Sequence, residues 1–299
     1  MKYLNTETKK RPVKKSIAQF MTMAALLSIL LFALGGSGCL GQNSADKNVV
    51  VSGSTSVLPP AQVLSEEYMK KNNETIISVK GGGSGTGIAE LIDSTNDIAM
   101  SSRKIKDTEV SNAKAKGIDP VEHIIAKDGI SVVINPSNPV TTLTLEQLQK
   151  IYSGEIKNWK EVGGADAEIA AIARDSSSGT QEFFKEAVMK DVEFRNDLIT
   201  QSATGAVTLE VSQNTKAIGF IGAAYQNENI KTVLIDAGAG AISPTEENIL
   251  SETYPLSRAL YLYTAQDPNP EAAKFIEYIM SDEGQKIIRE TGYAPIKTI

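Results

Sequence analysis

The chain has 299 residues, of which 41% are hydrophobic and 22% are charged, and its formal net charge is −6. This composition is typical of a globular protein and excludes a disordered one, while the length suits two domains of roughly 100 to 150 residues each. One cysteine excludes an internal disulfide, and one cysteine with one histidine cannot form a transition-metal cluster. We therefore expect neither a metal nor a cofactor.

The first 38 residues differ from the rest of the chain and have the layout of a secretory signal peptide. Six basic residues precede an apolar stretch at 21–34, which ends in Gly35-Gly36-Ser37-Gly38. This stretch is shorter than the roughly 20 residues that a membrane-spanning helix needs. We expect the leader to be removed, and an uncleaved anchor at 17–34 is the alternative.

Cys39 follows the small residues directly and resembles the lipobox cysteine that becomes the lipidated first residue of a lipoprotein. Gly36 stands where bacterial lipoboxes usually carry leucine, so the leader is closer to archaeal lipoprotein leaders. An incidental free thiol is the alternative. Residues 39–48 are polar and are expected to form a lipidated N-terminus and tether, which predicts an exported protein on the outer face of the cell membrane.

Removal of the leader makes the protein strongly acidic. The remaining 24 basic and 35 acidic residues give a net charge of −11, which repels nucleic acid and anionic membranes. An anion could still bind through oriented backbone amides and a few placed arginines. Five arginines remain, and two of them, Arg103 and Arg174, flank serine-rich runs.

Three runs of glycine and hydroxyl residues each lead into an expected amphipathic helix. They are Gly53-Ser54-Thr55-Ser56 before 57–71, residues 81–87 before 88–92, and residues 175–180 before 181–189. The start of a helix carries free N–H groups and about half a positive charge, so each run can hold an oxyanion. A single run is more often an ordinary cap or turn. It is the occurrence of all three that predicts an anion pocket.

Short β-strands are expected before these loops, at 49–51, 76–79, 97–100 and 170–173. The succession of strand, loop and helix predicts an α/β fold with parallel strands, whose ligands bind beyond the carboxyl ends of the strands. Two longer β runs, at 129–136 and 259–264, are expected to cross between two lobes. A C-terminal helix at 270–290 is expected to pack on the core, with an interruption at 282–284.

In their order and spacing, these loops resemble those of the phosphate-binding proteins of Pst-type phosphate ABC transporters. The resemblance extends from about Asn48 to Ile299 and includes residues 148–159, residues 217–220 and Tyr254-Pro255-Leu256-Ser257-Arg258. It implies a type II periplasmic-binding-protein fold, with two α/β lobes joined by a two-segment hinge. Lobe I would comprise 49–130 and 259–299, and lobe II 131–258.

The function implied by the resemblance is capture of inorganic phosphate between the lobes and delivery to the permease subunits of an ABC transporter, by a monomer without enzyme activity. Carried over by position, the ligand contacts fall on Thr55, Ser56, Ser84, Arg174, Ser178, Gly179 and Thr180. Arginine can bind two phosphate oxygens with its planar fork, and the other residues offer hydroxyls or amides.

The sequence departs from the family at one candidate position. The family commonly uses an aspartate there to accept the proton of hydrogen phosphate and so to reject sulfate, whereas this chain has Ser102, followed by Arg103. We include both residues in the expected phosphate site. Serine can donate or accept a hydrogen bond, and Asp128 or Asp175 could supply the missing carboxylate, so discrimination against sulfate is left open.

Two other functions compete with phosphate transport. The same fold could serve an anion sensor or bind another tetrahedral oxyanion, such as sulfate or molybdate. A serine hydrolase is suggested by Ser101-Ser102-Arg103-Lys104, which fits the Ser-x-x-Lys signature of penicillin-recognising enzymes. Because the accompanying Ser-Asp-Asn and Lys-Thr-Gly motifs do not occur, we do not expect an enzyme.

Overall fold

The computed structural model describes residues 47–190 and 192–297, and these lie within one compact unit, Ala45–Ile299. The predicted signal peptide, Cys39 and most of the predicted tether lie outside the described residues. Within the described part of the chain, no helix has the length and apolar character needed to cross a membrane.

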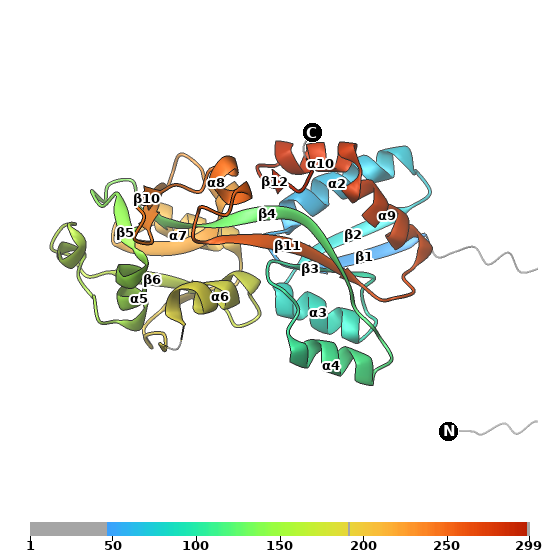
Figure 1. Cartoon of the computed structure of the whole chain (residues 1–299), viewed down its shortest axis with the longest axis horizontal. Helices are drawn as coiled ribbons and strands as arrows, with labels where there is room; N and C mark the ends of the chain where they lie inside the picture. Colours follow the sequence, from blue (N-terminus) through green and yellow to red (C-terminus); the bar gives the residue numbers. More distant parts are fainter. Residues whose placement is uncertain (1–46, 191, 298–299) are drawn as a thin grey trace, which may run out of the picture. The chain divides into compact units, whose positions relative to one another are not determined.

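Lobe I is built on the sheet order β2-β1-β3-β11-β4, shown on the right of Figure 1. The strands β1 (Asn48–Gly53), β2 (Ile76–Gly81) and β3 (Ile98–Ser101) are parallel, as predicted. The strand β11 (Ser257–Thr264) runs antiparallel to β3 and to β4 (Val121–Ile134). Helices cover both faces of the sheet: α2 (Leu58–Lys71), α9 (Pro270–Met280) and α10 (Asp282–Glu290) on one, α3 (Ser84–Ile92) and α4 (Asp107–Ala115) on the other.

The strand β3 explains why helices pack on both faces of this sheet. All four of its residues are buried, and successive side chains of a strand point to opposite faces. Ile98 and Met100 pack with α2, α9 and α10, whereas Ala99 packs with α3 and α4. An apolar run without alternation is typical of a strand that is covered on both sides.

Lobe II has a mixed sheet. The strand β6 (Ala170–Arg174) is parallel to β7 (Ile199–Gln201) and β8 (Ala217–Gly222), and the end of β4 pairs antiparallel with β8 and β9 (Lys231–Asp236). Two short strands, β5 (Thr142–Thr144) and β10 (Ala241–Ile242), flank β9. The helices are α5 (Leu145–Ser153), α6 (Gly179–Phe184), α7 (Thr204–Gln213) and α8 (Glu246–Leu250), with a π-helical turn at Lys185–Met189 and short 3-10 turns at Trp159–Val162 and Ala223–Tyr225.

The core of lobe II is centred on aromatic side chains. Phe184 and Phe220 stack with ring centroids 4.0 Å apart, and Tyr152 meets both rings edge-on. Trp159 is 1% exposed and joins the same core. This core is separate from the one under the lobe I sheet, so each lobe has its own apolar interior.

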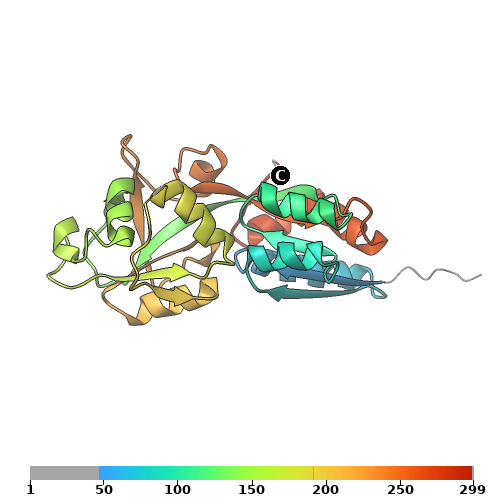
Figure 2. The same ribbon diagram turned by 90° about the horizontal axis from the view of Figure 1, so that it is seen from below.

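Two strands join the lobes, as Figures 1 and 2 show. Residues 121–129 of β4 pair with β11 in the lobe I sheet, and residues 130–134 pair with β8 and β9 in the lobe II sheet. The crossing strand therefore begins at Val121, earlier than predicted, because its first half is a full member of the lobe I sheet. The chain returns along β11, so the two crossing strands are antiparallel to each other. The expected α/β fold with a two-segment connection is confirmed.

The C-terminal helix is interrupted, as predicted, but the break lies at Ser281. The helix α9 ends at Met280, and the Ser281 hydroxyl accepts a hydrogen bond from the Gly284 amide at 3.2 Å to begin α10. The strand β12 (Ala294–Pro295) then pairs with β4. The last helices and strand are thus tied to the lobe I sheet.

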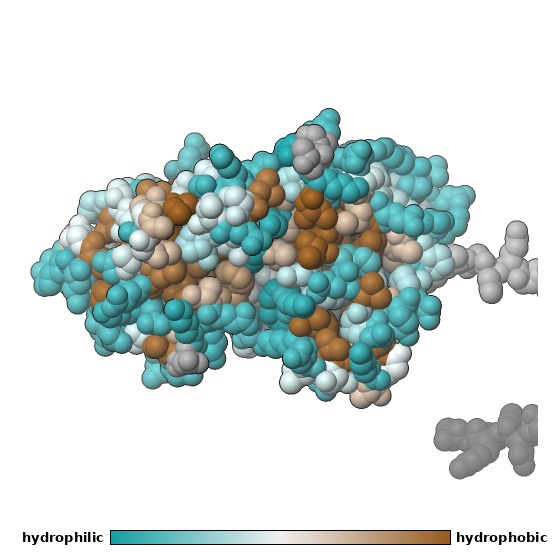
Figure 3. Space-filling view, viewed as in Figure 1, coloured by the Kyte–Doolittle hydropathy of each residue, from teal (hydrophilic) through white to brown (hydrophobic). Residues whose placement is uncertain are grey.

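The surface is mainly hydrophilic, with separate hydrophobic patches on the face shown in Figure 3. The large hydrophobic side chains that are exposed come from elements of both lobes: Val63, Ile76, Val121, Ile124, Leu209 and Leu250. Scattered exposed apolar residues are normal for a globular protein.

Candidate anion-binding site

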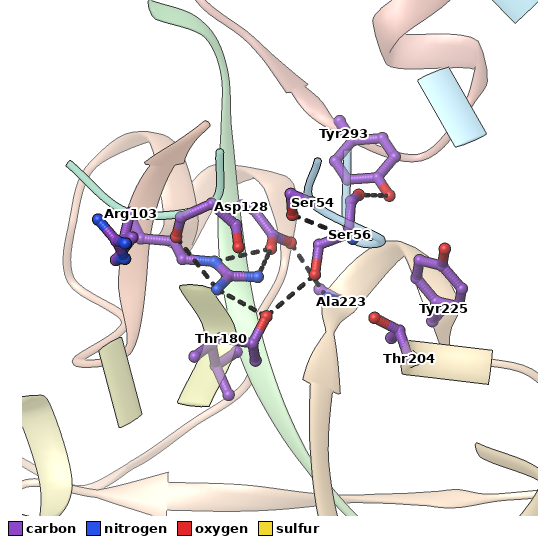
Figure 4. Close-up of polar contacts among 12 residues, drawn as sticks. Ser54, Ser56, Arg103, Asp128, Thr180, Thr204, Ala223, Tyr225 and Tyr293 are labelled. Carbon is purple, nitrogen blue, oxygen red and sulfur yellow. Dashed lines mark hydrogen bonds and ion pairs between the residues drawn. The ribbon is translucent and has the colours of Figure 1, made fainter. Parts of the chain in front are cut away.

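The three loops predicted from the sequence meet where the lobes touch. The Ser56 hydroxyl, before α2, lies 3.0 Å from the Thr180 hydroxyl at the start of α6 (Figure 4). The Gly85 amide of the second loop donates to the Ser177 carbonyl of the third at 2.9 Å. The Ser177 side-chain oxygen lies 3.1 Å from the Gly82 carbonyl oxygen. Lobe I therefore contributes two of the loops and lobe II the third.

Hydroxyl groups from both lobes are buried at this junction. Ser84 lies 3.4 Å from Ser102, measured between their side-chain oxygens, and its oxygen accepts a hydrogen bond from the Ser102 amide at 3.0 Å. Ser178 caps α6, since its oxygen accepts from the Gln181 amide at 3.3 Å. The predicted serine and threonine residues at the junction, apart from Thr55, are no more than 2% exposed: Ser56, Ser84, Ser102, Ser178 and Thr180.

Gly179 allows the two lobes to approach this closely. A Cβ atom at this position would lie 2.3 Å from the Ser84 oxygen and 2.7 Å from the Ser102 oxygen, both in lobe I. Such distances are shorter than any ordinary contact of a Cβ atom. The lack of a side chain at Gly179 therefore allows the start of α6 to lie against the hydroxyls of the other lobe.

Arg174 reaches the first loop from the end of β6. Its Nε and Nη2 atoms donate to the carbonyls of Gln201 and Ser202 at 3.0 and 2.9 Å. Its Nη1 and Nη2 atoms also donate to the hydroxyls of Thr204 and Thr55 at 3.1 and 3.2 Å. Burial lowers the pKa of Arg174 below its ordinary value, but a guanidinium stays charged near neutral pH. Arg174 thus places a buried positive charge next to Thr55.

Two tyrosines that the sequence did not indicate hold the first loop in place. Tyr225 donates from its hydroxyl to the Thr55 carbonyl. Tyr293 donates from its hydroxyl to the Ser56 carbonyl at 2.6 Å (Figure 4). Burial raises the pKa of Tyr225 to about 12, so this hydroxyl keeps its proton and remains a donor at neutral pH. Tyr225 is far from the loop in sequence, and no motif marked either residue.

Arg103 does not join the cluster of hydroxyls. Its Nη1 and Nη2 atoms bind the two carboxylate oxygens of Glu109 at 2.8 and 2.6 Å, and Nη1 also donates to the Lys104 carbonyl. Burial acts to raise the pKa of Glu109, but the bonds from Arg103 and from the Lys106 amide outweigh it and lower that pKa. Figure 4 shows Arg103 apart from Ser56 and Thr180. Its place in the phosphate site stays a prediction.

A second buried arginine, Arg258, lies at the cluster, although no binding role was predicted for it. Its Nη1 atom donates to the Thr180 hydroxyl at 3.0 Å and to the Ser102 carbonyl at 3.3 Å. Its Nε and Nη2 atoms donate to Asp128 at 3.1 and 2.7 Å. The motif Tyr254-Pro255-Leu256-Ser257-Arg258, noted in the sequence, was the available signal for this residue.

The other residues considered in the sequence are occupied by local bonds. Asp175 accepts from the amide and hydroxyl of Ser177 at 3.0 and 2.6 Å, and so shapes its own loop. The hydroxyl of Ser101, the nucleophile in the hydrolase hypothesis, donates to the Arg103 carbonyl at 2.6 Å. Ser101 is fully buried and Lys104 is exposed, which does not favour activation of this serine by the lysine.

Comparison with known proteins identifies the family. The model of the PBP superfamily domain matches residues 41–283. The phosphate-binding protein PstS of Borreliella burgdorferi is 34% identical over 281 residues, covering 90% of this chain and 98% of that protein. The chain belongs to the PstS family.

Solved structures agree with this membership of the PstS family. One is the Clostridium perfringens substrate-binding protein assigned to a phosphate ABC transporter and solved with bound phosphate, with a TM-score of 0.78 and 33% identity, covering 84% of this chain and 100% of that one. Another is the ABC-type phosphate transport receptor of Vibrio cholerae, with a TM-score of 0.67 and 35% identity, covering 82% and 98%. The resemblance of the loops to the Pst-type proteins is thereby confirmed.

Proposed function

We propose that this chain captures inorganic phosphate between its two lobes and delivers it unchanged to the permease of an ABC transporter. The observation that carries the proposal is the convergence of buried hydroxyls from both lobes beside the guanidinium of Arg174. The names of the relatives support it, since they are described as phosphate-binding proteins and phosphate transport receptors.

Capture would work by closure of lobe I, residues 49–130 and 259–299, against lobe II, residues 131–258. The anion would replace direct contacts between the lobes, such as the pair Ser56 and Thr180, with its own bonds to both hydroxyls. Hydroxyls and amides in a water-free pocket bind an oxyanion strongly because no solvent competes with them. Arg174 would supply the positive charge that the strongly acidic surface cannot.

Calorimetric titration of ligand-stripped protein with phosphate, sulfate and molybdate tests the proposal. We expect one phosphate per chain, and a loss of about 2 to 5 kcal/mol of binding free energy in Arg174→Ala because a desolvated charge pair loses one member. Arg195→Ala is the matched control, since Arg195 is another buried lobe II arginine but is paired with Asp197. Unchanged phosphate binding by Arg174→Ala, or tighter binding of sulfate than of phosphate by the parent, would overturn the proposal.

Two further features are part of the proposed function. We infer that the protein is exported and held at the outer face of the membrane by lipid on Cys39, as the leader predicts, and that it acts as a monomer. Ser102, in place of the usual carboxylate, favours incomplete rejection of sulfate. Growth on limiting phosphate, with and without the gene, distinguishes transport from a sensory role.

A further inference from the structure

Arg258 occupies a position that no other arginine of the described chain shares. It is 6% exposed and is the second residue of β11, paired in register with Asp128 of β4. These two strands form the connection between the lobes, and β4 passes into the lobe II sheet directly after Gly129. Arg258 therefore lies in a hinge strand and not in one of the loops that form the junction of the lobes.

Asp128 fixes the direction of this guanidinium. Its Oδ2 atom accepts bonds from Nε and Nη2 of Arg258, and its Oδ1 atom accepts from the Ala223 amide, just after β8 of lobe II. An arginine held by a carboxylate along one edge presents its remaining nitrogen in a defined direction. Here that nitrogen is Nη1, and it faces Thr180 of lobe II and the Ser102 carbonyl of lobe I.

The bond to Thr180 determines the direction of that hydroxyl's proton. A guanidinium can only donate, so the Thr180 oxygen must accept from Nη1, and its own proton is left for another partner. By the same reasoning, the Ser84 oxygen accepts from the Ser102 amide, and its proton also points elsewhere. Both residues are thus prepared as donors, which is the role that an oxyanion requires.

We propose that Arg258 is a positioning residue of the anion site, which orients the Thr180 hydroxyl as a donor to the bound anion and ties that donor to the hinge. The inference rests on the proposed function. Asp128 balances the charge of Arg258, so the pair contributes direction rather than net attraction. Arg174 differs from Arg258 in its bonding partners, because the bonds described for its side chain go to carbonyl and hydroxyl oxygens and not to a carboxylate.

The test is a double-mutant cycle on phosphate affinity, with Arg258→Lys and Thr180→Val, measured by calorimetry on ligand-stripped protein. Lysine keeps the charge beside Asp128 but cannot bind Asp128 and Thr180 with a rigid fork. We expect each single variant to weaken binding about 10- to 100-fold, the range for a hydrogen bond to a charged group. The double variant should be little weaker than either single one, because both remove the same oriented donor.

Two controls separate positioning from general damage. Arg195→Lys alters a pair between another buried arginine and the exposed carboxylate of Asp197, and should leave the phosphate affinity within about twofold, as expected for a residue outside the site. If Arg258→Lys does not fold, the double change Asp128→Asn with Arg258→Gln takes its place in the cycle, since it removes the guanidinium and keeps the net charge of the pair at zero.

The outcomes distinguish this inference from the proposed function. If the parent binds phosphate and Arg258→Lys binds it with the same affinity, the positioning role alone is overturned. The same holds for the Asp128→Asn and Arg258→Gln double change where that replaces Arg258→Lys. Fully additive losses would also overturn it, because they would show that the arginine does not act through Thr180. A parent that binds no phosphate would overturn the proposed function and this inference together.

Discussion

Replacement of Gly179 by alanine should impair closure of the lobes without impairing folding of the protein. The added Cβ would lie 2.3 Å from the Ser84 oxygen and 2.7 Å from the Ser102 oxygen, more than 0.5 Å inside ordinary van der Waals contact in both cases. Ser84 cannot rotate away freely, because its oxygen accepts the bond from the Ser102 amide. The clash exists only while lobe II touches lobe I.

The size of the effect follows from this geometry. Forcing one extra methyl group into a well-packed junction typically costs about 1 to 3 kcal/mol. The open, ligand-free protein escapes this cost by separating its lobes, so the penalty falls on binding and weakens phosphate affinity about 5- to 150-fold. Gly179 is the first residue of α6, and alanine is the better helix former, so folding of the free protein should not suffer.

The assay is phosphate titration by calorimetry, together with thermal unfolding of the free and phosphate-saturated protein. Gly205→Ala is the matched control, because Gly205 lies in α7 of the same lobe and an added Cβ would meet nothing within 4 Å. We expect the stabilisation by phosphate to shrink in Gly179→Ala and to stay at the parent's value in Gly205→Ala. Parent-like affinity in Gly179→Ala would refute the closed junction as the binding geometry.

Three further changes address selectivity, pH and anchoring. Ser102→Asp should increase the preference for phosphate over sulfate, because a carboxylate accepts the phosphate proton and repels a bare oxyanion; equal sulfate rejection by variant and parent in competition titrations would place proton recognition elsewhere. Burial lowers the pKa of His123 below its ordinary 6.5, so the unfolded chain takes up the proton first and stability falls as the pH drops through 6.5. His123→Gln should therefore reduce the loss of thermal stability between pH 7 and 5, and an identical pH profile would contradict this assignment. Cys39→Ser should abolish lipidation and membrane partitioning in the native host, whereas an unlipidated soluble parent would remove the anchor from the proposal.

The sequence alone predicted the parts of this protein that depend on neighbouring residues. The strands ending at the glycine and serine loops, the helices that follow, and the break near residue 282 are set by short-range patterns of apolar, capping and turn residues. The order of the loops then identified most of the hydroxyls that the structure brings together, since ligands of α/β folds bind beyond the carboxyl ends of the strands, where all three loops lie.

Tertiary structure decided which charged groups and hydrogen-bond donors face the junction of the lobes. Arg103 follows one serine run and Arg174 precedes another, yet Arg103 binds the carboxylate of Glu109 whereas Arg174 binds threonine hydroxyls. Arg258 reaches Thr180 only because β11 returns beside β4, and Tyr225 reaches Thr55 across the junction of the lobes. Contacts between residues so distant in sequence arise from the packing of whole elements, because a buried charge or hydroxyl must find its partner wherever the fold places one.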